Sequence, residues 1–158
     1  MTSELITSWA AHDAALHRIL LLATISLHVF DEDLQKLKLE TRDNADCLHR
    51  FLAADRKNRL RIALSNPEPL RRQSPRLIKL LATYPQQMSV LQCPSHLAPT
   101  NDSLCLADAR HALVRANKDH ARGRMIIDSA AECSPFENQF AAIIDEGGEP
   151  ISATTLGL

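Results

Sequence analysis

The sequence has few aromatic residues and no excess of charge of either sign. Only 4% of its 158 residues are Phe, Trp or Tyr, which leaves few side chains on which single-stranded bases could stack. Eighteen Lys and Arg nearly balance 19 Asp and Glu, so no global field attracts the protein to nucleic acid or to an anionic membrane. We therefore expect no nucleic-acid partner unless basic residues gather in a local patch.

Long apolar runs and closely spaced cysteines are also missing. The run from Ile19 to Ala23 is far too short to span a bilayer, and the residues before it lack the basic region of a secretory signal. The four cysteines are widely spaced, at Cys47, Cys93, Cys105 and Cys133. Without a Cys-x-x-Cys pair, reduced thiols are the simpler interpretation. We expect a cytoplasmic protein with no disulfide and no membrane association.

A hydrophobic content of 45% is sufficient for one compact domain over residues 1–158, with a core at about 10–145 and a C-terminal tail at 149–158. Apolar periodicity predicts strands at 25–29, 59–64, 88–92 and 125–127. It predicts helices from Ser3 or Ser8 to Ala23, from a cap at Asp43 or Asn44, from Ser74-Pro75 to Tyr84, and from a capping box at Ser134–Glu137 to Gly147-Gly148. Residues 34–42 fit a strand or a helical turn, and Pro67 to Pro69 fit a loop.

The alternation of strands and helices predicts an α/β fold. Because helices separate the early strands, we expect a mixed, mostly parallel sheet with helices on both faces. The window from Asn101 to Asn117 predicts a hairpin added at one side. The same window could instead form a helix capped by Asn101 or Ser103, because Leu104, Leu113 and several alanines favour helix.

The Asn101–Asn117 window resembles the His-x-Lys-x-x-x-x-Asp motif of the phospholipase D superfamily. Asp108 stands at the motif aspartate, while Asn101 replaces the histidine and Ser103 replaces the lysine. Asn117 stands near the asparagine that follows in the family, without the usual preceding Gly-Ser. Further support comes from the order of four segments: Leu60–Leu64 with Asn66-Pro67, Leu77–Leu81, Leu104–Asp108 and Phe140. More narrowly, the chain resembles a bacterial domain of unknown function with one half of that fold.

The resemblance implies a degenerate site. In the catalytic family the histidine attacks phosphorus and the lysine binds phosphate oxygens, and neither function is available to Asn101 or Ser103. We therefore expect a non-catalytic binding or interaction module without cofactor, for a phosphate-containing ligand or a protein partner. A homodimer is expected, because catalytic relatives bring two half-domains together. Asp108 would accept backbone hydrogen bonds in the 108–110 turn, and Asn117 would end a strand.

The candidates for ligand binding by the module are Asp108, His111, Arg115 and Asn117. Two alternatives use the same region. In the first alternative, Asp108, His111, Arg115 or Cys105 act in the repurposed cleft of a hydrolase acting on a phosphate-containing substrate. In the second, basic residues bind nucleic acid weakly. Three basic groups could line a phosphate groove: Arg56, Lys57, Arg59 and Arg61; Arg71, Arg72, Arg76 and Lys79; and Arg115, Lys118, Arg122 and Arg124.

Possible metal ligands occur at Cys93 and His96, with Cys105, His111, His120 and Cys133 elsewhere. Their spacing is not that of a closed metal site, so we predict no metal. Isolated cysteines of this kind usually pack in the core as small apolar residues.

Overall fold

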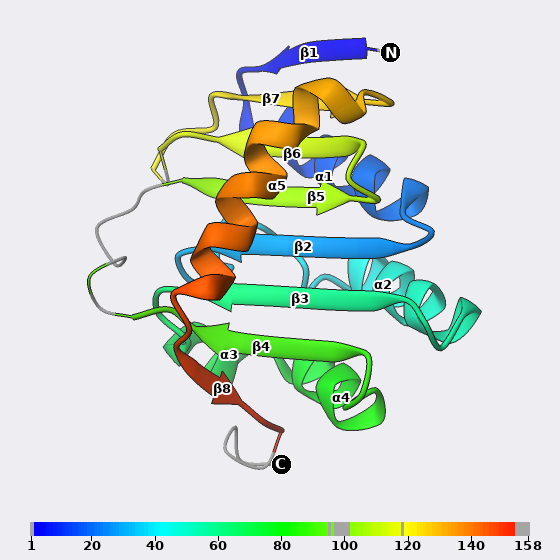
Figure 1. The fold of residues 1–158 in the computed structure, drawn as a ribbon, viewed down its shortest axis with the longest axis vertical. Coiled ribbons are helices and arrows are strands. Elements are labelled where there is room, and N and C mark those ends of the chain that lie inside the picture. Colours follow the sequence, from blue (N-terminus) through cyan, green and yellow to red (C-terminus); the bar gives the residue numbers. More distant parts are fainter. Residues whose placement is uncertain (1, 95, 97–101, 118, 154–158) are drawn as a thin grey trace.

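The computed structural model describes residues 2–94, 96, 102–117 and 119–153 (Figure 1). In chain order the elements are β1 (Thr2–Ile6), α1 (Trp9–Leu22), β2 (Ser26–Asp31), α2 (Arg42–Ala54), β3 (Arg59–Leu64), α3 (Glu68–Gln73), α4 (Pro75–Thr83), β4 (Met88–Gln92), β5 (Ser103–Ala107), β6 (His111–Arg115), β7 (Gly123–Ile127), α5 (Ala130–Asp145) and β8 (Glu149–Ile151). Across these described residues, no helix has both the length and the apolar character needed to cross a membrane.

The strands form one open sheet in the order β1-β7-β6-β5-β2-β3-β4-β8. β2, β3 and β4 are parallel to one another, and the other neighbouring pairs are antiparallel. The predicted α/β class with a mixed sheet is confirmed, but the predicted mostly parallel pairing is wrong. In the described chain, helical connections join neighbouring strands only at β2, β3 and β4, whereas a hairpin and two unpredicted end strands add antiparallel pairs.

Helices cover both faces of the sheet, as predicted (Figure 1). On one face, α1, α2 and α4 enclose the larger core cluster, whose strand residues include Val29, Ile62 and Cys105. On the other face, α5 packs over a second cluster with Phe30, Leu104 and other strand residues. Side chains alternate between the two clusters along each central strand, which explains why both faces of these strands are apolar.

The N-terminal segment differs from the prediction. Residues Thr2–Ile6 form β1, which pairs antiparallel with β7 at one edge of the sheet. α1 therefore begins at Trp9, where the Ser8 side chain caps it by accepting the N–H of Ala11 at 3.1 Å. Of the two predicted starting points, Ser8 is confirmed and Ser3 is wrong, because edge pairing with β7 satisfies the backbone of residues 2–6.

Two other helix starts lie before the predicted residues. Thr41 caps α2 by accepting the N–H of Asn44, so the predicted cap at Asp43 or Asn44 is wrong. Ser129 caps α5 by accepting the N–H of Glu132, and the predicted box at Ser134–Glu137 lies inside that helix. Each true cap offers a hydroxyl oxygen to an otherwise unpaired N–H of the first turn.

Three smaller segments can also be compared with the prediction: the prolines near α3, residues 34–41 and the C-terminal residues. The predicted Pro67–Pro69 loop overlaps the start of α3, which begins at Glu68. Residues 34–41 form neither a strand nor a helix, although Leu34, Leu37 and Leu39 are buried. α5 ends before Gly147 and Gly148, as predicted, where φ values of +81° and +135° suit glycine. Residues 149–151 of the predicted tail form β8 beside β4, and residues 154–158 lie outside the described residues.

Candidate functional site

The predicted hairpin is present, and the alternative helix across this window is wrong. β5 and β6 pair antiparallel with Ser103 opposite Arg115 and Ala107 opposite His111. The turn closes through the N–H of Arg110, which donates to the carbonyl of Ala107 at 3.1 Å. Asp108 and Ala109 both have φ of 58°, the positive values that a tight hairpin turn of type I′ requires. Asn101 lies outside the described residues.

Asp108 connects the hairpin turn to the segment that enters β2. Its Oδ1 accepts the N–H groups of Ile25 at 2.7 Å and Ser26 at 3.0 Å, and its Oδ2 accepts the hydroxyl of Thr24 at 3.0 Å. The N–H of Thr24 also lies within 3.1 Å of both carboxylate oxygens. These bonds hold residues 24–26 rather than the 108–110 turn itself. The geometry gives Asp108 a positioning contact with the backbone.

His111 lies at the same end of the hairpin. Its Nδ1 accepts the N–H of Asp128 at 3.0 Å, and Asp128 forms an ion pair with Arg110. Burial lowers the pKa of His111, while the carboxylate of Asp108 raises it and Arg110 lowers it further. A neutral imidazole that accepts a backbone hydrogen bond fits this environment.

The other two ligand candidates lie at the opposite end. Arg115 ends β6, four residues from His111, which corresponds to about 13 Å of strand, and Asn117 follows two residues later. Asp108 and His111 therefore do not meet Arg115 in one cleft, as the alternative enzyme would require of these candidates. The hairpin separates these residues into a turn end and an open end.

A buried ion pair occupies the open end. Nη2 of Arg115 lies 3.4 Å from Oδ1 of Asp31, and the two side chains are 1% and 3% exposed. The hydroxyl of Ser103, at the motif lysine position, also hydrogen-bonds the Asp31 carboxylate. Burial raises the pKa of Asp31. The hydrogen bonds from Ser103 and from the N–H of Leu34, together with the charge of Arg115, lower this pKa and oppose the effect of burial. Asp31 was not predicted as a site residue, although it follows Leu27 and Val29 at every second position of β2 and therefore shares their buried face.

Trp9 covers the same ion pair from α1. The guanidinium carbon of Arg115 lies 5.1 Å from the centre of the Trp9 ring, and Nζ of Lys36 lies 5.2 Å from it. Burial lowers the pKa of Arg115, and Asp31 opposes this effect. Nη1 of Arg115 also donates to the carbonyl of Asn117 at 3.1 Å. The Arg115 guanidinium is thus held inside the fold by the Asp31 carboxylate and the Trp9 ring.

Cys105 does not have the properties of a nucleophile. The strand register places it on the same face as His111, but its side chain is fully buried in the larger core cluster. Burial raises the pKa of the Cys105 thiol to about 12, so the thiolate is not populated near neutral pH. All four cysteines are buried free thiols. Within the described ranges, no three His, Cys, Asp or Glu side chains gather in a way that could hold a metal ion.

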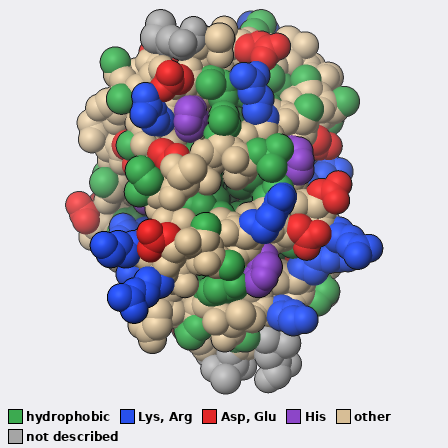
Figure 2. Space-filling model, turned by 90° about the vertical axis from the view of Figure 1, so that its right-hand side faces the viewer, with side chains coloured by type: hydrophobic (Ala, Val, Ile, Leu, Met, Phe, Trp, Pro, Cys, Tyr) green, Lys and Arg blue, Asp and Glu red, His purple; other side chains and the backbone are tan. Residues whose placement is uncertain are grey.

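The three basic groups do not form one groove. Arg59 donates to the carbonyls of Arg56 and Asn58, and Arg76 lies 3.5 Å from Glu40. On the end of the molecule that carries the β5–β6 turn, Figure 2 shows basic and acidic side chains interspersed around hydrophobic ones. Of the predicted set, Arg115, Arg122 and Arg124 line a common pocket at the open end, and Lys118 lies outside the described residues.

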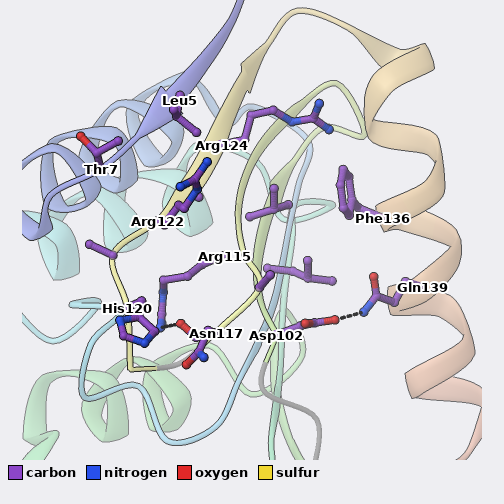
Figure 3. A pocket seen from close by; sticks show the side chains of 15 residues that line it. Leu5, Thr7, Asp102, Arg115, Asn117, His120, Arg122, Arg124, Phe136 and Gln139 are labelled. Carbon is purple, nitrogen blue, oxygen red and sulfur yellow. Dashed lines mark hydrogen bonds between the residues drawn. The ribbon is translucent and has the colours of Figure 1, made fainter.

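This pocket has a volume of about 700 Å³ and lies mainly on the sheet face that α5 covers (Figure 3). Figure 3 shows Phe136 and Gln139 of α5 on one side and Leu5 and Arg122 on the other, with the Arg124 side chain extending from β7 toward α5. Nε2 of Gln139 donates to Oδ2 of Asp102 at 3.1 Å across the pocket. The full lining is Leu5, Thr7, Asp102, Leu104, Val114, Arg115, Ala116, Asn117, His120, Ala121, Arg122, Gly123, Arg124, Phe136 and Gln139.

Comparison with known proteins identifies a family and a set of similar folds. Residues 8–151 match the model of a family described as "Domain of unknown function (DUF7931)". No curated protein is similar enough in sequence to match the chain. The family match covers every described element except β1.

Among solved structures, the chain is similar to TrmBL2, an archaeal chromatin protein whose structure shows a novel mode of DNA binding. The TM-score is 0.68 at 10% sequence identity, and the match covers 94% of this chain and 54% of the TrmBL2 chain. It is similar to NucT from Helicobacter pylori, with a TM-score of 0.59, 11% identity, and coverage of 96% and 98%. It is also similar to phosphatidylserine synthase from Haemophilus influenzae Rd KW20, with a TM-score of 0.63, 13% identity, and coverage of 99% and 40%.

NucT and phosphatidylserine synthase have phospholipase D-superfamily folds. The chain spans about half the length of the TrmBL2 chain and less than half of the phosphatidylserine synthase chain. At identities of 10–13%, these likenesses establish the fold alone.

Proposed function

This chain belongs to the DUF7931 family, and we propose that it is a non-catalytic module with a phospholipase D-like fold, which acts by binding rather than by cleaving a phosphodiester bond. The observation that carries the proposal is the buried Asp31–Arg115 pair beside Ser103. It occupies the end of the hairpin where the resembled motif would place its catalytic lysine.

The residues at this end do not supply the chemistry of the resembled family. A phosphoryl-transfer site needs an activated nucleophile and a cation directed at the developing charge on the phosphoryl oxygens. Ser103 is 2% exposed, and its hydroxyl hydrogen-bonds the Asp31 carboxylate. Arg115 is directed at Asp31 and lies over Trp9. A substrate phosphate would have to displace Asp31 from a buried ion pair, which is energetically costly.

A homodimer is part of the same proposal. Catalytic proteins of the resembled fold combine two half-domains, and this chain covers 40% of the phosphatidylserine synthase chain but 98% of the NucT chain. The described fold therefore has the extent of one such half. Two copies would meet through the same surface on each chain. Light scattering over a concentration series tests this part, and a mass of one chain at every concentration would remove the dimer.

Hydrolysis of a chromogenic phosphodiester tests the main proposal. We expect the purified protein to release no more product than buffer does. Release that disappears in both Ser103→Ala and Arg115→Gln variants would show catalysis at the hairpin and would overturn the proposal. Because Arg115→Gln removes a buried partner, the milder Ser103→Ala variant and a thermal melt of each protein separate loss of activity from loss of folding.

A further inference from the structure

We propose that the pocket beneath α5 binds an anionic amphiphile, a ligand with an apolar chain and a carboxylate or phosphate head. This inference rests on the proposed function only in that both give the chain a binding role. The pocket is lined mainly on the α5 face of the sheet, whereas Asp31 and Ser103 lie on the face covered by α1. The pocket therefore shares Arg115 and Asn117 with the open end of the hairpin, but its apolar floor lies on the opposite face of the sheet from Asp31 and Ser103.

The floor and walls of the pocket are apolar. Leu104 and Val114 are directly paired on β5 and β6, and Phe136 of α5 packs against the same core cluster. Leu5 of β1 is 60% exposed and pairs with Arg124 of β7, so its side chain extends the apolar wall beyond the end of α5. A ligand chain lying across these residues would remove apolar surface from water, which favours binding at roughly 25 cal/mol per Å² buried.

The rim of the pocket is basic. Arg122 and Arg124 are both exposed, and neither forms an ion pair with a carboxylate of the described chain. The guanidinium carbon of Arg124 lies 5.9 Å from the centre of the Phe136 ring, which places its charge beside the apolar wall. Asp102, the acidic residue among the lining residues, already accepts a hydrogen bond from Gln139. Guanidinium groups pair well with carboxylate or phosphate oxygens, so the rim selects an anionic head.

The size of the pocket selects a small molecule. Its volume of about 700 Å³ falls within the range of drug-sized ligand sites. A free inorganic phosphate would leave the apolar floor uncovered, and an uncharged chain would leave the two arginines without an anionic partner. Nucleic acid is a poorer fit, because Phe136 is the aromatic side chain available for base stacking in the lining. A single apolar chain with one anionic head satisfies both halves of the site.

β1 contributes directly to this specificity. Leu5 and Thr7 line the pocket but precede residues 8–151, which match the family. The apolar wall on that side therefore lies outside the residues that match the family model. A variant at Leu5 alters the pocket without touching the family core, and its high exposure limits the cost to folding.

Titration calorimetry of the full chain tests the inference, with decanoate and decyl phosphate below their micelle concentrations as probes. Decanol and inorganic phosphate are the matched probes that lack the head or the chain. We expect at least one anionic amphiphile to bind about tenfold or more tightly than either matched probe. A preference for decyl phosphate assigns a phosphate head, and a preference for decanoate assigns a carboxylate head.

Three variants locate the site. The double variant Arg122→Gln/Arg124→Gln should weaken binding of the anionic amphiphile about tenfold or more, and Leu5→Ser should weaken it several-fold. Arg72→Gln, a change at an arginine side chain that is 79% exposed on α3, should leave binding unchanged. Binding that the double variant retains in full, or no binding of either amphiphile to protein that melts cooperatively, would overturn the inference. Phosphodiester turnover would overturn the proposed function and leave this site standing.

Discussion

Arg115, at the end of β6, reaches past Ser103 of β5 to place its Nη2 3.4 Å from Oδ1 of Asp31 at the end of β2. Three neighbouring strands thus contribute to one buried polar cluster on the α1 face. In the resembled enzymes this end of the hairpin carries the reaction, and here a structural ion pair occupies it. Its contribution to stability can be separated from any contribution to function.

Breaking this pair from one side should be costly. Arg115→Met leaves the Asp31 carboxylate buried without its cation, so the free energy of unfolding should fall by about 3–5 kcal/mol. The double variant Asp31→Asn/Arg115→Met removes both charges and keeps an acceptor for the N–H of Leu34, so it should recover at least half of that loss. Urea unfolding measures both. Equal losses in the single and double variants would contradict a charge-pairing role.

Removing the Asp108 carboxylate should loosen the entry to β2. Asp108→Ala leaves the N–H groups of Ile25 and Ser26 without their acceptor, and hydrogen bonds to a charged group contribute about 1.5–3 kcal/mol. We expect a loss of about 2–3 kcal/mol by urea unfolding and faster amide exchange at residues 24–26. Unchanged exchange there would show that other contacts hold this segment.

Ala109 offers a stabilising change. Its φ of 58° is costly for alanine and acceptable for glycine, so Ala109→Gly should raise the free energy of unfolding by about 1 kcal/mol. Ala14→Gly is the matched control, since Ala14 is exposed in the middle of α1, where glycine costs about 0.5–1 kcal/mol. In thermal melts, we expect the first variant to raise the melting temperature and the control variant to lower it. A loss of stability in both variants would contradict the turn geometry.

His12 should make the fold sensitive to mild acid. Its ring is 1% exposed, and neither ring nitrogen has a hydrogen-bond partner among the described residues. Burial lowers the pKa of His12, and the charge of Arg115 lowers it further, while Asp13 at 3.7 Å raises it. Because the unfolded state takes up this proton more readily, stability is complete above pH 6.5 and falls as the pH drops toward the lowered pKa.

The slope attributable to His12 is limited to about 1.4 kcal/mol per pH unit for one proton. His12→Leu should therefore flatten the decline in unfolding free energy between pH 7 and pH 5. His111→Asn is the comparison variant, since burial also lowers the pKa of His111 and accounts for a separate share of the decline. A His12→Leu profile parallel to that of the original protein would show that His12 does not titrate as described.

The central strands and the hairpin could be predicted because their apolar residues alternate or run continuously over a buried face. β3 and β4 have the predicted bounds, and the strand-turn-strand window formed although its turn contains Asp-Ala rather than a glycine pair. β1 could not be predicted, because four of its five residues are exposed at the sheet edge and show no alternation. Strand direction also depends on which strands become neighbours, and short-range patterns do not record this.

The polar residues of the open end were predicted only in part. Ser103 was recognised through the resembled motif and Arg115 as a ligand-binding candidate, whereas Asp31 was not singled out from the sequence. Its burial follows from the register of β2 against β5, which places it on the face beneath α1. The α5 pocket was missed for a similar reason, since its lining comes from β1, the hairpin, β7 and α5.

The most direct test of the account is a single-turnover assay, with the protein in large excess over a phosphodiester substrate, followed to completion by product formation. The non-catalytic account predicts a rate equal to that of buffer, both for the original protein and for Ser103→Ala. Product formation by the original protein that Ser103→Ala abolishes, while the variant melts at the same temperature, would contradict it.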